Sequence, residues 1–224
     1  MQAVILAAGK GLRLRPITET VPKALVDVCG TPLIFHILGS LPSTVTEIFV
    51  VVGYLGEQIV AAIGDAFDGR TVRYVTQDPL DGTGSALRLL KDALHGKFLV
   101  VNGDDLYGAD DLGRLVAHDL AVLVAPTNDE TGSTAVVDET DKFVGIQSDS
   151  TIKTRLRVCG AYVLDERFFN YELATVTVHD KIEYSLPHTI VAMACDHAIA
   201  TEVATQWQPV GTHEELSRVR CRRQ

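Results

Sequence analysis

The sequence has few cysteines and no cysteine motif. Its four cysteines, Cys29, Cys159, Cys195 and Cys221, are scattered along 224 residues without C-x-x-C spacing. That distribution indicates neither a zinc site nor a disulfide framework. We expect the four side chains to be reduced, small residues of the core.

Long hydrophobic runs and linker-like segments are also absent. No stretch of about 18 apolar residues could span a membrane, and the chain starts with a strand-like segment instead of a signal-like run. We therefore expect a cytoplasmic protein with no membrane partner. Because there is no Pro/Gly/Ser-rich spacer or internal repeat, residues 1–224 are predicted to form a single domain.

Positive charge is in deficit. The chain has 20 Lys and Arg against 29 Asp and Glu, a formal charge of −9. This balance argues against nucleic acid as a partner. The arginines at 218, 220, 222 and 223 are better explained as the end of a helix, whose dipole favours cations there.

The densest set of residues with special chemistry lies in residues 2–41. The run from Ala3 to Ala8 is continuously apolar, which is typical of a buried parallel strand. Glycines and cations follow it, and ligands bind outside the carboxyl ends of strands in open α/β sheets, where glycines let backbone N–H groups approach phosphate oxygens. The segment therefore predicts a polyphosphate site; its residues are Gly9, Lys10, Gly11, Arg13, Arg15 and Lys23.

Two common phosphate-binding motifs do not fit this segment. A dinucleotide fingerprint would need glycine at position 14, which is Leu14, and Pro16 interrupts the helix that should follow. A P-loop would need G-K-S or G-K-T, and neither is present. What remains is G-x-G-x-R followed by Pro16 and then Pro22-Lys23.

The pattern LAAGKGLRLRPITETVPKAL resembles the signature of sugar-1-phosphate nucleotidyltransferases. The resemblance implies a Rossmann-like α/β/α three-layer fold with a mostly parallel mixed sheet. It also implies a nucleotide-binding half, residues 1–105, and an acceptor sugar-phosphate half, residues 106–224. The implied partners are a nucleoside triphosphate and a sugar 1-phosphate, joined into a nucleotide-sugar with release of pyrophosphate.

The same resemblance assigns roles around the first strand. The nucleotide site would include Leu6, Ala7 and Ala8, with the Gly9 and Gly11 amides and Arg13 at the β- and γ-phosphates. Lys23 would neutralise the α-phosphate and the incoming phosphate. Asp104, in Asn102-Gly103-Asp104, matches the metal-binding aspartate and would hold Mg²⁺, whereas Asp105 fits a solvated turn.

A second segment, QDPLDGTGSAL from Gln77 to Leu87, resembles the base-binding segment of that family. Its glycines can lie flat against a base, and Thr83 is expected to cap a helix running to about Leu94. The Gln77 amide offers one donor and one acceptor, which complement uracil and thymine. Gln77, Gly82 and Thr83 are thus candidate nucleotide contacts, and UTP or dTTP is favoured.

The acceptor half matches the family unevenly. Gly160 and Glu183 resemble sugar-site residues, but Gln147-Ser148-Asp149 replaces the expected Glu-Lys-Pro, so the usual acceptor lysine is missing. In an extended segment, Lys153, Arg155 and Arg157 would share one face and could hold the acceptor phosphate, although a solvated strand edge explains the same alternation.

Other positions leave alternatives open. Pro209 stands where many members carry a second metal-binding aspartate, so triphosphate and water would complete the metal site, or catalysis would be impaired. A non-catalytic nucleotide-sugar-binding regulatory homologue is therefore the rival reading. We read His179, His188 and His197 as structural or surface residues. A homo-oligomer is left open.

Overall fold

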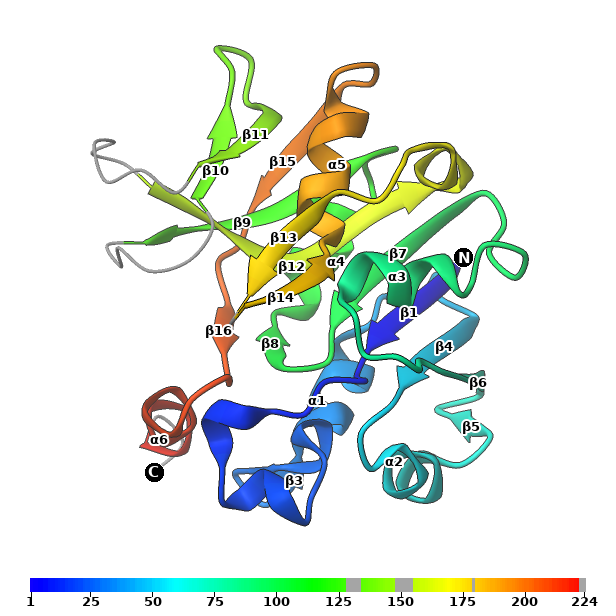
Figure 1. The fold of residues 1–224 in the computed structure, drawn as a ribbon, viewed down its shortest axis with the longest axis vertical. Coiled ribbons are helices and arrows are strands. Elements are labelled where there is room, and N and C mark those ends of the chain that lie inside the picture. Colours follow the sequence, from blue (N-terminus) through cyan, green and yellow to red (C-terminus); the bar gives the residue numbers. More distant parts are fainter. Residues whose placement is uncertain (128–133, 148–154, 179, 222–224) are drawn as a thin grey trace.

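The computed structural model describes residues 1–127, 134–147, 155–178 and 180–221. A ten-stranded sheet runs through both halves of the chain in the order β10-β11-β15-β9-β12-β7-β1-β4-β6-β5 (Figure 1). Its strands are β1 (Gln2–Leu6), β4 (Glu47–Val52), β5 (Ala66–Phe67), β6 (Arg70–Thr76), β7 (Lys97–Asn102), β9 (Ala121–Thr127), β10 (Thr134–Val137), β11 (Lys142–Gln147), β12 (Arg155–Asp165) and β15 (Ile199–Val203).

Strand direction changes across this sheet. In the first half β1 pairs in parallel with β4 and β7, and β4 pairs in parallel with β6. Beyond β7, strand β12 pairs antiparallel with both β7 and β9. Strand β15 pairs in parallel with β9. The predicted α/β class and mixed sheet are confirmed, with the parallel pairings concentrated among β1, β4, β6 and β7.

Helices cover both faces and make three layers. Their bounds are α1 (Leu33–Ser40), α2 (Gly56–Ile63), α3 (Thr83–Arg88), α4 (Ala109–Leu115), α5 (Leu186–Ala194) and α6 (His213–Cys221). Because side chains alternate across a strand, β1 sends Ala3 and Ile5 into the core beneath α1 and α4, and Val4 into the core beneath α3 and α5. Both faces of β1 are thus dry, which explains its unbroken apolar run.

Short elements complete the fold. They are the 3₁₀ turns η1 (Leu12–Leu14), η2 (Ile17–Glu19), η3 (Lys23–Leu25) and η4 (Glu166–Asn170), and the two-stranded pairs β2 (Asp27–Val28) with β3 (Thr31–Pro32), β8 (Asp105–Tyr107) with β16 (Trp207–Pro209), and β13 (Thr175–Val178) with β14 (Lys181–Tyr184). The helix predicted to reach Leu94 ends earlier, since α3 stops at Arg88 and the chain continues in turns. No helix in the described ranges is long and apolar enough to cross a membrane.

Candidate active site

A cleft of about 1410 Å³ opens at the carboxyl ends of β1, β6 and β7 and continues between β12, the β13–β14 hairpin and the first turn of α5. It collects most of the side chains predicted from the sequence. Those lining it are Leu6, Ala7, Ala8, Gly9, Gly11, Arg13, Lys23, Gln77, Gly82, Thr83, Asp104, Arg157, Gly160 and Glu183. Lys153 lies outside the described residues, as does the side chain of Arg155 at the start of β12.

The loop after β1 is held by close packing at Gly11. This residue has a φ of 62°, and a Cβ there would lie 3.0 Å from the Thr18 Cγ2 atom and 3.1 Å from the Lys23 Cβ atom. The Thr18 hydroxyl donates to the Gly11 carbonyl oxygen at 2.8 Å. Glycine is therefore required both for the left-handed backbone and for the approach of Lys23.

Arg13 meets the far end of the chain. A Cβ on Gly211 would lie 2.7 Å from an Arg13 guanidinium nitrogen, and the Gly211 amide donates to a Glu215 carboxylate oxygen at 2.8 Å. The segment between β16 and α6 thus packs against the Arg13 guanidinium. Sequence reasoning did not find this contact, because 198 positions separate Arg13 and Gly211 along the chain.

Lys23 and Asp104 form an ion pair at the centre of the cleft. The Lys23 Nζ and Asp104 Oδ2 atoms are 2.5 Å apart, with side-chain exposures of 12% and 36%. Lys23 comes from η3 and Asp104 follows β7. A Cβ on Gly103 would lie 2.8 Å from the Leu6 carbonyl oxygen, so this glycine lets the two strand ends converge. A cation and a carboxylate that can face the same phosphate group are thus brought together.

Asp105 is not the solvated residue that the sequence suggested. It is buried, and burial together with the neighbouring Asp104 charge raises its pKa well above the usual range. Pro209 pairs with Asp105 in the β16–β8 ladder, and the Val210 amide donates to the Asp104 carbonyl oxygen at 3.0 Å. Pro209 therefore lies beside the predicted metal-binding Asp104, but its side chain has no atom that could bind a metal ion.

Gln77 lies buried at the end of β6 with its amide turned toward the protein. Its Nε2 donates to the Gly82 carbonyl oxygen at 2.9 Å and to the Ser85 hydroxyl at 3.0 Å. Within the described part of the chain Oε1 takes no hydrogen bond. In this orientation Gln77 offers a base an acceptor only, and not the donor and acceptor that we expected side by side.

Thr83 does not cap its helix. The N-cap of α3 is Gly82, and no side-chain capping bond is present there. The Thr83 hydroxyl instead accepts a hydrogen bond from the Leu186 amide at 3.1 Å. A threonine hydroxyl can act in either role, and here packing against α5 selects the second.

Two glycines bring the halves of the cleft together. Gly82 has a φ of 119°, and a Cβ there would overlap the backbone of Tyr184 in β14. Gly160 has a φ of 69°, and a Cβ there would overlap the side-chain amide of Asn102. The Tyr184 amide also donates to the Asp81 carbonyl oxygen at 2.7 Å. The loop that precedes α3 and the β13–β14 hairpin are thus in direct contact.

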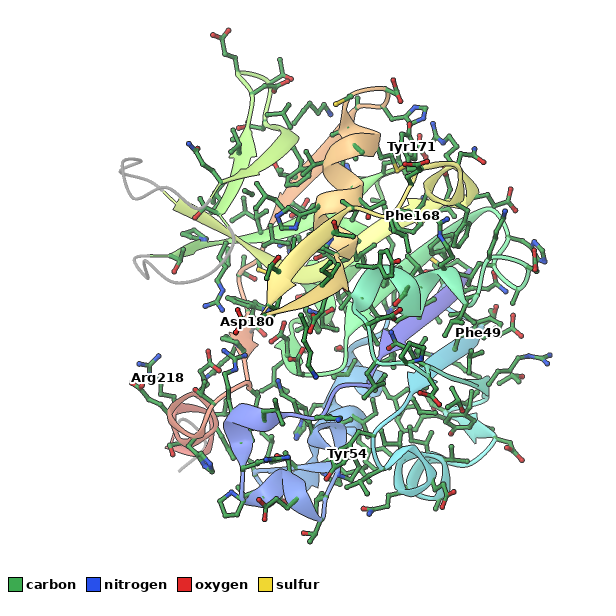
Figure 2. The ribbon with its side chains drawn as sticks, viewed as in Figure 1. Phe49, Tyr54, Phe168, Tyr171, Asp180 and Arg218 are labelled. Atoms are coloured by element: carbon green, nitrogen blue, oxygen red, sulfur yellow. The ribbon has the colours of Figure 1, made fainter. Side chains whose placement is uncertain are left out.

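The β13–β14 hairpin forms the outer wall, with Asp180 in its turn (Figure 2). Directly paired residues share a face in an antiparallel ladder. The Val176–Glu183 and Val178–Lys181 pairs both line the cleft. The sequence analysis named Glu183 but missed Lys181, although their spacing of two residues on a strand could have indicated a shared face.

Charges of both signs line the cleft, with cations in excess. The cations are Lys10, Arg13, Lys23, Arg157 and Lys181, and the carboxylates are Asp78, Asp104 and Glu183. The Arg157 guanidinium carbon lies 5.5 Å from the centre of the Trp207 ring, within the range of a cation–π contact. In a chain of formal charge −9, this concentration of cations favours an anionic ligand.

Fold and cleft together define an α/β protein whose cleft, at the carboxyl ends of parallel strands, is rich in cations and contains a Lys–Asp ion pair. The chain belongs to the nucleotidyl transferase family, which matches residues 2–223. It is 30% identical over 221 residues to the bifunctional protein GlmU of Methanococcus aeolicus, covering 96% of this chain and 53% of that protein.

Other relatives agree with this family. UTP–glucose-1-phosphate uridylyltransferase AglF of Haloferax volcanii is 40% identical over 117 residues, covering 52% of this chain and 48% of that one. The structure of a glucose-1-phosphate thymidylyltransferase from Bacillus anthracis, described as putative, superposes with a TM-score of 0.85 at 25% identity, covering 99% and 94% of the two chains. The chain spans about half the length of the curated relatives it matches most fully.

Proposed function

We propose that this protein transfers a nucleotidyl group from a nucleoside triphosphate to a sugar 1-phosphate. In this reaction a phosphate oxygen of the sugar phosphate attacks the α-phosphorus, the α–β phosphoanhydride bond breaks, and pyrophosphate leaves. The observation that supports it best is the Lys23–Asp104 pair, 2.5 Å apart in a cleft rich in cations. A phosphate monoester with a second pKa near 6 is already ionised at pH 7, so the attack requires no general base.

Each half of the cleft contributes to this chemistry. The Gly9 and Gly11 amides and Arg13 would hold the β- and γ-phosphates, and Lys23 would neutralise the charge that develops at the α-phosphate. Arg157 lines the cleft and would hold the incoming phosphate of the sugar. It would thus replace the lysine of the Glu-Lys-Pro motif, which this sequence lacks. Catalysis would then consist of alignment and charge neutralisation.

The residues fit a magnesium ion held by a single protein carboxylate. Asp104 is partly exposed to the cleft, and only its Oδ2 atom is engaged by Lys23. Within the described residues no cluster of three or more His, Cys, Asp or Glu could enclose a metal. Mg²⁺ commonly binds through one or two carboxylates plus phosphate oxygens. When bound it would neutralise the triphosphate, with Asp104 as its protein ligand.

The base is proposed to be uracil or thymine. The free Gln77 Oε1 can accept the N3–H that both pyrimidines present, whereas adenine has an acceptor at the equivalent edge position. Guanine also presents a donor there, so Gln77 alone rejects GTP less strongly than ATP. Relatives named as uridylyltransferase and thymidylyltransferase support the same choice.

Pyrophosphate release tests the proposal. The purified protein is incubated with Mg²⁺, each of UTP, dTTP, GTP and ATP, and a panel of hexose 1-phosphates. We expect release with UTP or dTTP as the best triphosphate and with at least one sugar phosphate. Tight binding of finished nucleotide-sugars without any release would instead support a regulatory homologue, and a preference for GTP or ATP would refute the proposed role of Gln77.

A further inference from the structure

His188 stands in the acceptor wall of the cleft, and none of the roles above uses it. It lies in the first turn of α5 and lines the same cavity as Glu183 and Arg157. The sequence analysis read it as a structural or surface residue. The structure shows instead a half-buried imidazole with access to the cleft.

The backbone that carries His188 is fixed from several sides. The Leu186 amide donates to the Thr83 hydroxyl at 3.1 Å, which ties α5 to α3. The Thr189 hydroxyl accepts from the Ala174 amide at 3.0 Å and donates to the Ser185 carbonyl oxygen at 2.8 Å. Side chains mounted on rigid elements can select ligands by position, and this turn meets that condition.

Ser185 lies within hydrogen-bond distance of one ring nitrogen of His188 and leaves the other nitrogen to the cleft. Ser185 is the N-cap of α5, and its hydroxyl oxygen accepts from the His188 backbone amide. The same hydroxyl lies 2.7 Å from His188 Nδ1. In this position the Ser185 hydroxyl can donate to Nδ1. A neutral ring that accepts at Nδ1 carries its proton on Nε2.

Burial favours the neutral ring, and with Nδ1 accepting from Ser185 the Nε2–H is available to a ligand. Burial lowers the pKa of His188 below its ordinary value of 6.5. Nε2 forms no hydrogen bond within the described residues, yet it is not one of the buried nitrogen atoms that lack a partner, so solvent in the cleft reaches it.

A neutral donor is suited to a different part of the substrate from the cations. Lys23 and Arg157 match phosphate oxygens, whereas an uncharged N–H matches a neutral oxygen without attracting a second anion. We propose that His188 is a specificity residue of the acceptor site, which donates its Nε2–H to an uncharged oxygen of the sugar, a hydroxyl or an N-acyl carbonyl. This inference rests on the proposed function, because the sugar 1-phosphate is its ligand.

The test compares three variants with the wild type, using the sugar 1-phosphate that gives the fastest pyrophosphate release. H188F removes the donor, H188Q restores an N–H, and H95F replaces an exposed histidine outside the cleft as a control. We expect H188F to raise the KM for sugar phosphate about five- to a hundredfold, the usual effect of a lost polar contact. The KM for the triphosphate should stay within about twofold, H188Q should recover part of the loss, and H95F should match the wild type.

Sugar analogues locate the contacted oxygen. The wild type and H188F are compared on the deoxy analogue at each ring position and on the N-acetylated and free-amino forms. For one analogue the two proteins should become equally poor, because the missing oxygen and the missing donor belong to one interaction. Unchanged KM in H188F, or an equal loss for both substrates and every analogue, would overturn the inference.

A second readout, ligand binding, does not depend on turnover. If the wild type released no pyrophosphate, the proposed function would fail, but calorimetric binding of UDP-glucose and UDP-N-acetylglucosamine to the wild type and H188F would still decide the role of His188. At least fivefold weaker binding of one of them by H188F supports it, and equal affinities for both refute it.

Discussion

At the scale of single residues, the Lys23–Asp104 pair is the feature on which the proposed function most depends. The Lys23 side chain is mostly buried in the cleft, and its nearest anionic group is Asp104 at 2.5 Å. A bound triphosphate would replace Asp104 as the partner of Lys23 only if it attracted the lysine more strongly than the carboxylate does. The pair therefore preorganises a cation where negative charge develops during the proposed transfer.

Replacement of this lysine should separate activity from stability. We expect Lys23→Ala to lower kcat by about a hundredfold or more, because a preorganised cation at a reacting phosphate contributes roughly 3 kcal/mol. The melting temperature should change little, since Asp104 can be hydrated in the cleft. Lys91→Ala, at an exposed site outside the cleft, is the control. A folded K23A protein with more than about a tenth of wild-type activity would remove Lys23 from the chemistry.

Asp104 should govern the magnesium requirement. With Pro209 at the neighbouring position, no second aspartate supplies a ligand from β16. Asp104→Asn is expected to raise the Mg²⁺ concentration for half-maximal pyrophosphate release by about tenfold or to abolish release. Asp92→Asn, at an exposed carboxylate that does not line the cleft, should leave the titration unchanged. The same Mg²⁺ dependence in D104N and wild type would place the metal elsewhere.

At the scale of elements, the loop that precedes α3 packs directly against the β13–β14 hairpin at Gly82. Alanine at this position meets both an unfavourable φ of 119° and the Tyr184 backbone. The hairpin carries Glu183 and Lys181 into the acceptor side of the cleft. Movement of the hairpin would thus disturb both substrates.

Gly82→Ala should raise KM for the triphosphate and for the sugar phosphate together, each by about fivefold or more. Gly64→Ala is the matched control, because Gly64 also has a positive φ, 74°, but no atom within 4 Å of its added Cβ. It should show the cost of backbone strain alone, about 1 kcal/mol of stability, with both KM values unchanged. An effect of G82A on one substrate only would show that the two walls are independent.

Hydrogen bonds to Asp111 in α4 fix the segment that leads into β16. The buried Asp111 carboxylate in α4 accepts hydrogen bonds from the amides of Thr205 and Gln206 and from Arg114. Burial alone would raise the pKa of Asp111, but these donors lower it below its usual value. A lowered native pKa adds stability that is present above the unfolded value near 3.9 and is lost as pH falls through the native pKa.

Asp111→Asn should therefore destabilise the fold at pH 7 by about 1–3 kcal/mol, with less difference from wild type below about pH 4. Urea unfolding at a series of pH values measures this. Asp110→Asn, an exposed neighbour in the same helical turn, is the control and should change stability by less than about 0.5 kcal/mol. Equal stabilities of D111N and wild type at pH 7 would contradict the assigned role.

At the scale of the whole molecule, an acidic protein presents a cleft in which cations outnumber carboxylates. The surrounding negative charge repels anions, whereas the cations inside the cleft attract them. The attraction extends over about one Debye length, which shrinks from about 10 Å at 0.1 M salt to about 3 Å at 1 M. Contacts already formed with a bound phosphate are screened much less.

Raising potassium chloride from about 0.05 M to about 0.5 M should consequently raise the KM for triphosphate about threefold or more, with kcat within about twofold. Melting temperatures in the same buffers control for a change in stability. A KM that is independent of salt would show that the cleft cations do not attract the substrate.

The sequence alone determined the local parts of this protein. The unbroken apolar runs at β1, β4 and β7 predicted buried strands, and the special residues after them predicted the nucleotide loops, because backbone conformation and burial are encoded within a few residues. The resemblance then predicted site roles for Arg13, Lys23, Asp104 and Gln77, and these four residues line one cleft. Their roles stay predictions.

The tertiary structure decided what depends on distant partners. Asp105 is buried by β16, Thr83 is engaged by α5, Gln77 donates to its own loop, and Arg13 packs against Gly211. The contacts of Asp105, Thr83 and Arg13 join residues far apart in the sequence, which only the tertiary fold brings together. The Gln77 bonds stay within its loop and depend on how that loop folds. His188 shows the same limit, because a lone histidine in sequence has no preferred role until the fold places it in a cleft beside a serine.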